Sequence, residues 1–183
     1  MSVRAVDVLN NAYVNQPCYI VGRGPSLAYL QARHFGPGPV IVLNDAIVHV
    51  QELGLVNIIY SFQKDAYDWA VQRPVDHIAL ILQDQYGSEL FPEHPTRLMV
   101  DPVVDMGFAS EEMSIRMAIR MTIWMGCSGI RFVCCDSLNT GDLRSYGSDG
   151  SVSNRADYMY QYVKPLVVSD LKDIPHDFIT PIP

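Results

Sequence analysis

Residues 18–27 read Cys-Tyr-Ile-Val-Gly-Arg-Gly-Pro-Ser-Leu, and this stretch carries the main signal for the fold of the chain. Its first four residues are typical of a buried strand that ends at Gly22, and Pro25 and Ser26 mark a helix start. Such a junction leaves backbone N–H groups and the positive end of a helix dipole facing whatever lies above the strand. Gly24 would let the backbone approach an anion with no Cβ in the way. The stretch therefore predicts a phosphate-binding turn.

The remaining chain alternates apolar, β-branched runs with segments of helical periodicity. We expect strands at residues 17–22, 40–43, 56–60, 77–82, 97–100, 130–135 and 178–180. We expect helices at residues 3–14, 26–33, 46–53, about 65–72, 110–125 and 154–172, the last interrupted near Pro165, and a polar loop at 137–153. This alternation predicts a single-domain α/β protein over residues 1–183, with a Rossmann-like layered fold and a mostly parallel sheet flanked by helices.

Composition restricts the function classes. The formal net charge of −7 argues against non-specific binding to nucleic acid, which requires a basic surface. No apolar run is long enough to cross a bilayer, and the first residues do not form a secretion signal. The four cysteines (Cys18, Cys127, Cys134 and Cys135) show no CxxC spacing and are expected to be reduced thiols, which predicts a cytoplasmic protein. A homo-oligomer remains compatible with the sequence.

Polar residues follow several of the expected strands. In parallel sheets, ligands bind beyond the carboxyl ends of the strands, near the point where strand order reverses. We therefore expect these polar groups to converge on one edge of the sheet. They are Gly22, Arg23, Gly24, Pro25 and Ser26, then Asn44 and Asp45, then Ser61 and Gln63, then Asp101, and finally Asp136.

With these positions assembled, residues 22–27 resemble the glycine-x-glycine-proline-serine-leucine opening of bacterial sialyltransferases that use CMP-activated sialic acid. The same opening occurs in related uncharacterised proteins and in archaeal pterin pyrophosphokinase-like proteins. The resemblance implies that Asn44, Ser114 and Asp136 contact the nucleotide. It also implies that Tyr146 hydrogen-bonds the leaving phosphate. Arg155, or Arg144, would assist as a cation beside that phosphate.

Three functions follow as alternatives. The first is a transferase that binds a nucleotide or nucleotide-sugar, with a CMP-type donor as substrate and no firm cofactor. Residues 150–155 contain no histidine where the sialyltransferases carry their general base, so the base is unassigned. The second is a Mg²⁺-dependent pyrophosphokinase-like enzyme using ATP, in which Asp101, Asp136 or Asp142 would form the metal cluster. The third is a nucleotide-binding protein without catalysis.

Overall fold

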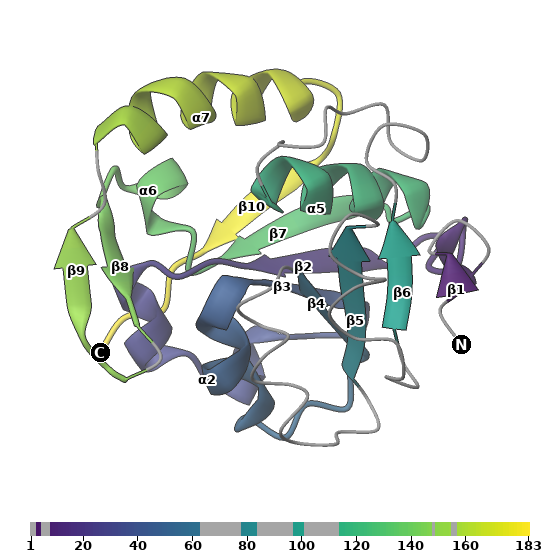
Figure 1. Ribbon diagram of the computed structural model, residues 1–183, viewed down its shortest axis with the longest axis horizontal. Helices are drawn as coiled ribbons and strands as arrows, with labels where there is room; N and C mark the ends of the chain where they lie inside the picture. Colours follow the sequence, from purple (N-terminus) through teal and green to yellow (C-terminus); the bar gives the residue numbers. More distant parts are fainter. Residues whose placement is uncertain are drawn as a thin grey trace.

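The computed structural model describes residues 3–4, 8–62, 78–83, 97–100, 114–147, 149–154 and 157–183 (Figure 1). The strands are β1 (Val3–Arg4), β2 (Pro17–Val21), β3 (Val40–Leu43), β4 (Ile59–Phe62), β5 (Ile78–Gln83), β6 (Arg97–Val100), β7 (Gly129–Val133), β8 (Arg144–Tyr146), β9 (Val152–Asn154) and β10 (His176–Ile179). The α-helices are α2 (Ile47–Gln51), α5 (Ser114–Trp124), α6 (Asp136–Asn139) and α7 (Asp157–Asp170). Three 3₁₀ helices are η1 (Pro25–Tyr29), η2 (Ala32–His34) and η3 (Asn44–Ala46).

The described strands form one large sheet and one small hairpin. The large sheet has the order β1-β6-β5-β4-β3-β2-β7-β10, and its pairings are parallel. β8 and β9 form a separate antiparallel pair. The prediction of an α/β fold with a largely parallel sheet is confirmed.

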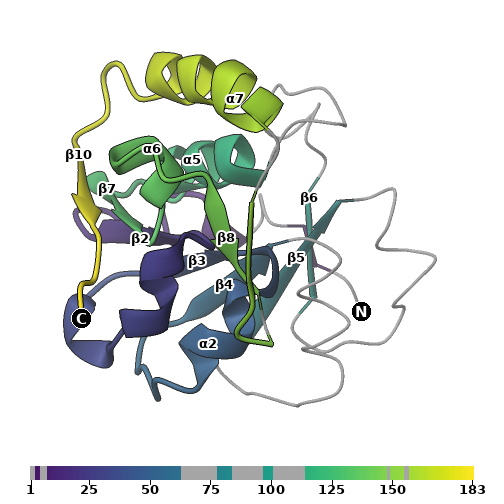
Figure 2. The same ribbon diagram turned by 90° about the vertical axis from the view of Figure 1, so that its left-hand side faces the viewer.

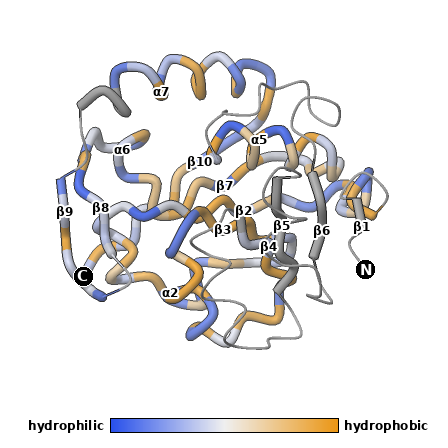
Figure 3. The backbone as a smooth tube through the Cα atoms, viewed as in Figure 1, coloured by the Kyte–Doolittle hydropathy of each residue, from blue (hydrophilic) through white to orange (hydrophobic). Residues whose placement is uncertain are grey.

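The central strands are apolar along almost their whole length, and successive side chains point to opposite faces, so both faces of the sheet are buried. One face packs against α5 and α7, and the other packs against η1 and α2 (Figures 1 and 2). Figure 3 shows the apolar colour concentrated along these central strands. The core between the first face and its helices includes Ile20, Ile41, Tyr60, Met117, Phe132 and Val167. The second includes Tyr19, Val21, Leu27, Val42, Ile47 and Val133. The result is a three-layer sandwich of helices, sheet and helices.

The strand order reverses beside β2. From β2 the chain moves outward through β3, β4, β5 and β6, and it later returns to place β7 against the other side of β2. The carboxyl ends of β2 and β7 therefore flank a switch point of the kind where ligands bind in open α/β sheets. Residues 22–26, which we call the glycine turn, follow β2. The segment that leads to Asp136 follows β7.

Several predicted boundaries are wrong near the start of the chain. Val3–Arg4 is a strand paired with β6, not part of a helix. The expected helix at 26–33 is instead the two short 3₁₀ helices η1 and η2. The strand expected at residues 56–60 is β4 and begins only at Ile59. Val56 is fully exposed, and the Asn57 side chain donates to the carbonyls of Gly36 and Gly38.

Later boundaries also differ. The expected loop at 137–153 contains most of α6 and the β8–β9 hairpin. Pro165 lies inside α7 on its exposed side, and the helix continues through it. The expected helix at 65–72 and residues 110–113 lie outside the described residues.

Candidate functional site

The glycine turn is joined to the end of β7 by backbone hydrogen bonds. The Gly22 N–H donates to the Val133 carbonyl over 2.8 Å, and the Gly24 N–H donates to the Cys134 carbonyl over 2.8 Å. A Cβ built on Gly24 would lie 1.9 Å from Asp136 Oδ2 and 2.7 Å from the Cys134 oxygen. Residue 24 is therefore glycine because two segments of the protein itself approach it closely.

The Asp136 carboxyl group is the partner that this turn hydrogen-bonds. The residue is 2% exposed, and its Oδ2 accepts hydrogen bonds from the Ser26 N–H at 3.0 Å and the Ser26 hydroxyl at 2.8 Å. Its other oxygen, Oδ1, is buried and accepts no hydrogen bond from the described residues. The carboxylate fixes the glycine turn to the start of α6, a structural task that places both segments beside the switch point.

This arrangement corrects the predicted mode of phosphate binding. The turn was expected to offer free N–H groups and a helix dipole. Instead, the Ser26 N–H is taken by Asp136 and the Leu27 N–H donates to the Gly24 carbonyl over 2.9 Å. η1 has five residues, too few to build a substantial macrodipole. Any anion bound here must be recognised mainly by side chains around the turn.

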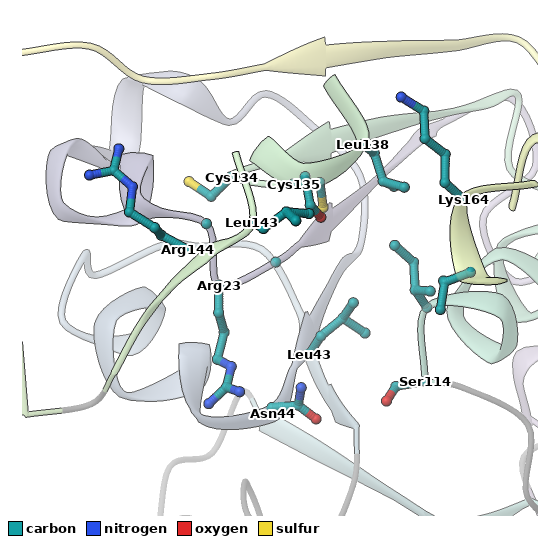
Figure 4. A pocket seen from close by; sticks show the side chains of 15 residues that line it. Arg23, Leu43, Asn44, Ser114, Cys134, Cys135, Leu138, Leu143, Arg144 and Lys164 are labelled. Carbon is teal, nitrogen blue, oxygen red and sulfur yellow. The ribbon is translucent and has the colours of Figure 1, made fainter. Parts of the chain in front are cut away.

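A pocket opens at the switch point beside this turn (Figure 4). It is built from the glycine turn, the end of β3, the start of α5, the segment after β7 and the middle of α7. Its lining comprises Gly22, Arg23, Gly24, Leu43, Asn44, Ser114, Ile115, Cys134, Cys135, Ser137, Leu138, Leu143, Arg144, Val163 and Lys164. Five residues predicted as binding residues thus meet in one pocket: Gly22, Arg23, Gly24, Asn44 and Ser114. They come from three separate parts of the chain.

Asn44 and Ser114 supply polar groups to one part of the pocket. Figure 4 shows the Asn44 carboxamide and the Ser114 hydroxyl directed into the same region, from η3 and α5 respectively. Asn44 has a left-handed backbone with φ of 54°, a conformation that asparagine tolerates better than most residues. Cys134 on the opposite wall also has φ of 54°. Such backbone strain is typical of functional sites.

The charges of the lining favour an anionic ligand. Among the described residues, the lining contains Arg23, Arg144 and Lys164 and no acidic residue, although acidic residues outnumber basic ones in the chain by 20 to 13. Arg23 forms an ion pair with Asp45. Arg144 is held by Asp142 through contacts of 2.6–3.1 Å, and this guanidinium lowers the pKa of the Asp142 carboxyl. Both counter-ions lie outside the lining, so Arg23 and Arg144 border the pocket while each is paired with an acidic residue next to it.

Other predicted residues take different positions. Pro25 begins η1, and Ser26 and Asp136 are buried behind the turn rather than lining the pocket. Asp45 forms an ion pair with Arg23 and does not line the pocket. Arg155 lies outside the described residues.

Tyr146 is placed beside the pocket rather than in its lining. Its N–H donates to the Arg23 carbonyl over 2.7 Å, and its ring packs on His49 with centroids 5.0 Å apart. The His49 Nε2 donates to the Gly147 carbonyl over 3.2 Å. Tyr146 and His49 therefore attach the β8–β9 hairpin to the glycine turn and to α2. This contact was not predicted, because nothing in the sequence relates residue 49 to residue 146.

Two lining features were also missed. Lys164 follows the inward-facing Val163 on α7, and only the register of that helix could have placed it at the pocket. Cys134 and Cys135 line the pocket through the turn that follows β7. Burial raises the pKa of the Cys134 thiol to about 12, so this thiol stays protonated.

No protein-family model matches the chain, and no curated protein matches it. The fold and the pocket define the class of protein: a doubly wound α/β domain with a pocket at its switch point that arginine and lysine residues help to line. Within the described residues, no group of three His, Cys, Asp or Glu side chains is arranged to hold a metal ion. None of the described helices has the length and apolar character needed to cross a membrane.

The backbone of residue 44 gives a testable prediction. Asn44→Gly removes the carboxamide and permits the positive φ, whereas Asn44→Ala forces a Cβ-bearing residue with no αL preference into that conformation. We expect Asn44→Ala to be less stable than Asn44→Gly by about 1 kcal/mol. Urea unfolding of the two variants measures this difference. Equal midpoints and slopes would show that residue 44 does not hold a left-handed backbone in solution.

Proposed function

We propose that the protein binds a nucleotide-activated donor in this pocket and is a transferase resembling the CMP-sugar glycosyltransferases. The observation that carries the proposal is the convergence of the glycine turn, Asn44 and Ser114 with three cationic side chains at the switch point. The substrate on this account is a CMP-type nucleotide-sugar.

The lining suggests a division of tasks. The apolar wall formed by Leu43, Ile115 and Leu138 suits the flat face of a base, and Asn44 and Ser114 are polar groups for its edge or for the ribose. The cations would bind the phosphate and stabilise the charge that develops on it as the bond to the sugar breaks. Arg144 is suited to this task because Asp142 already fixes its guanidinium.

A second function is favoured by one specific observation. The lining residues include no histidine, aspartate or glutamate, so the described pocket offers none of the usual general bases for an acceptor hydroxyl. This favours a nucleotide-binding protein without turnover. The same ligand experiment separates the two functions when a turnover assay is added.

Ligand-induced stabilisation tests the proposed function. The melting temperature is measured with CMP, CDP, UDP, GDP and ATP, each with and without Mg²⁺. A ligand at one hundred times its dissociation constant should stabilise the native state by about 2.7 kcal/mol. We expect CMP to raise the melting temperature without metal, and release of CMP from a CMP-sugar then distinguishes a transferase from a binding protein. Stabilisation by ATP only with Mg²⁺ would favour the pyrophosphokinase alternative instead.

Two serine variants provide a matched comparison. Ser114→Ala removes a hydroxyl from the pocket, whereas Ser169→Ala removes one from the exposed side of α7. Ser114→Ala should reduce the CMP-induced shift and Ser169→Ala should leave it unchanged. If no nucleotide shifts the wild-type melt, or if both variants behave alike, nucleotide binding at this pocket is contradicted.

A further inference from the structure

The β8–β9 hairpin carries Arg144 to the pocket although it lies beside the large sheet and not within it (Figure 1). Among the described strands, β8 and β9 pair only with each other, so that Arg144 faces Asn154 and Tyr146 faces Val152. All three residues of β9 are exposed. The position of the hairpin therefore depends on the contacts that β8 and the following turn make with the rest of the protein.

These contacts join the hairpin to two separate elements. The Tyr146 N–H donates to the Arg23 carbonyl in the glycine turn over 2.7 Å. The Tyr146 ring packs on the His49 ring of α2, with centroids 5.0 Å apart and an angle of 45° between the planes. The His49 Nε2 lies 3.2 Å from the Gly147 carbonyl oxygen, and because a carbonyl oxygen only accepts, Nε2 carries the proton. His49 thus holds two successive residues of the hairpin.

The segment that carries His49 also reaches the pocket itself. η3 and α2 are continuous in the chain, and Asn44 at the start of η3 lines the pocket. The next residue, Asp45, forms the ion pair with Arg23 of the glycine turn. Residues 44–49 therefore connect three parts of the site: the end of β3, the glycine turn and the hairpin.

Arg144 is the pocket residue that depends most on this connection. It lies two positions before Tyr146, so the two side chains leave the same face of β8. Its side chain is 56% exposed, and its ion-pair partner Asp142 lies on the same segment of chain, just before β8. The guanidinium therefore keeps its place at the pocket only as well as β8 does. A strand that is ordered before the ligand arrives loses less entropy on binding.

We propose that His49 is a positioning residue, which latches the β8–β9 hairpin to α2 and thereby raises the affinity of the pocket for its anionic ligand. His49 is not part of the lining, so it acts through Tyr146 and Gly147 and not on the ligand. The effect on affinity rests on the proposed function, whereas the latch itself does not.

Amide hydrogen exchange followed by NMR tests the latch without any ligand. The Tyr146 amide reports it, because this N–H is bonded to Arg23 of the glycine turn. We expect His49→Ala to speed the exchange of this amide about fivefold, the effect of losing one neutral hydrogen bond. Amides inside β7 should exchange as in wild type. His49→Gln, which can return an N–H to the Gly147 carbonyl, should restore part of the protection.

Calorimetric titration of CMP into the same proteins tests the positioning role. His49→Ala should bind CMP about fivefold more weakly, because the released strand must be ordered on binding. His49→Gln should recover part of the affinity. His176→Ala removes an exposed histidine from β10 and should match wild type in both measurements. If the alanine variant does not fold, His49→Phe, which keeps a ring but has no donor, takes its place.

The two measurements separate the possible failures. Unchanged Tyr146 exchange in His49→Ala overturns the latch. Faster exchange with unchanged CMP affinity overturns the positioning role. If wild type binds no CMP, the proposed function and the effect of His49 on affinity are both contradicted, and the exchange result still decides the latch.

Discussion

Replacing Gly24 with alanine is expected to lower the free energy of unfolding by about 3 kcal/mol. The new Cβ would lie 1.9 Å from Asp136 Oδ2 and 2.7 Å from the Cys134 carbonyl oxygen, and neither group is free to move. Asp136 is fixed by two hydrogen bonds from Ser26, and the Cys134 carbonyl accepts the Gly24 N–H. Urea unfolding followed by circular dichroism measures the loss.

Two further variants make this prediction specific. Gly22→Ala should cost less, because its Cβ would meet mainly the Cys135 sulfur at 2.8 Å and the Cys134 oxygen at 3.0 Å. In the Asp136→Ala background the two nearest clashing atoms are gone, so Gly24→Ala should become markedly less costly, which a double-mutant cycle detects. A Gly24→Ala protein as stable as wild type would contradict the close packing of the turn against Asp136.

Replacing Asp170 with alanine is expected to cost about 3 kcal/mol, because it removes a largely buried carboxylate that pairs with Arg116 of α5. The Arg116 Nε donates to Asp170 Oδ2 over 2.6 Å and its Nη2 donates to Oδ1 over 3.0 Å. The side chains of Arg116 and Asp170 are 13% and 7% exposed. This pair joins α5 to α7, the helices that bring Ser114 and Lys164 to the pocket, so the variant should also weaken ligand binding.

An exposed ion pair provides the control for this second prediction. Asp142→Ala removes the partner of Arg144, and the two side chains are 26% and 56% exposed. Because solvent screens that pair, its loss should change the free energy of unfolding far less than the loss of Asp170 does. Similar losses for Asp142→Ala and Asp170→Ala in urea unfolding would contradict the assignment of the Asp170 pair as the joint between the helices.

Much of the fold was predictable because its strands are short, apolar and separated by breakers. Residues 40–43 and 97–100 are strands as predicted, since each run carries its own hydrophobic signal. The misplaced start of β4 has a different cause. Val56 is apolar yet fully exposed, and the side chain of Asn57 is engaged by a segment about twenty residues earlier. Local pattern cannot reveal either fact.

The candidate site was predictable in position but not in its internal contacts. Parallel strands place their carboxyl ends at one edge, so Gly22, Asn44 and the end of β7 were expected to converge, and they do. The contact between Ser26 and Asp136 spans 110 positions. Through it, the Ser26 N–H donates to the Asp136 carboxyl group instead of to a ligand. The sequence contains both residues and nothing that pairs them, so the turn was interpreted as open to phosphate.

Calorimetric titration of CMP into wild type and Asn44→Gly tests the central claim most directly. Asn44→Gly keeps the left-handed backbone and removes only the side chain that η3 directs into the pocket. We predict that wild type binds CMP without metal and that Asn44→Gly binds it at least about tenfold more weakly, a difference of about 1.4 kcal/mol. The absence of CMP binding to wild type, or equal affinity in the two proteins, would contradict a nucleotide site at this switch point.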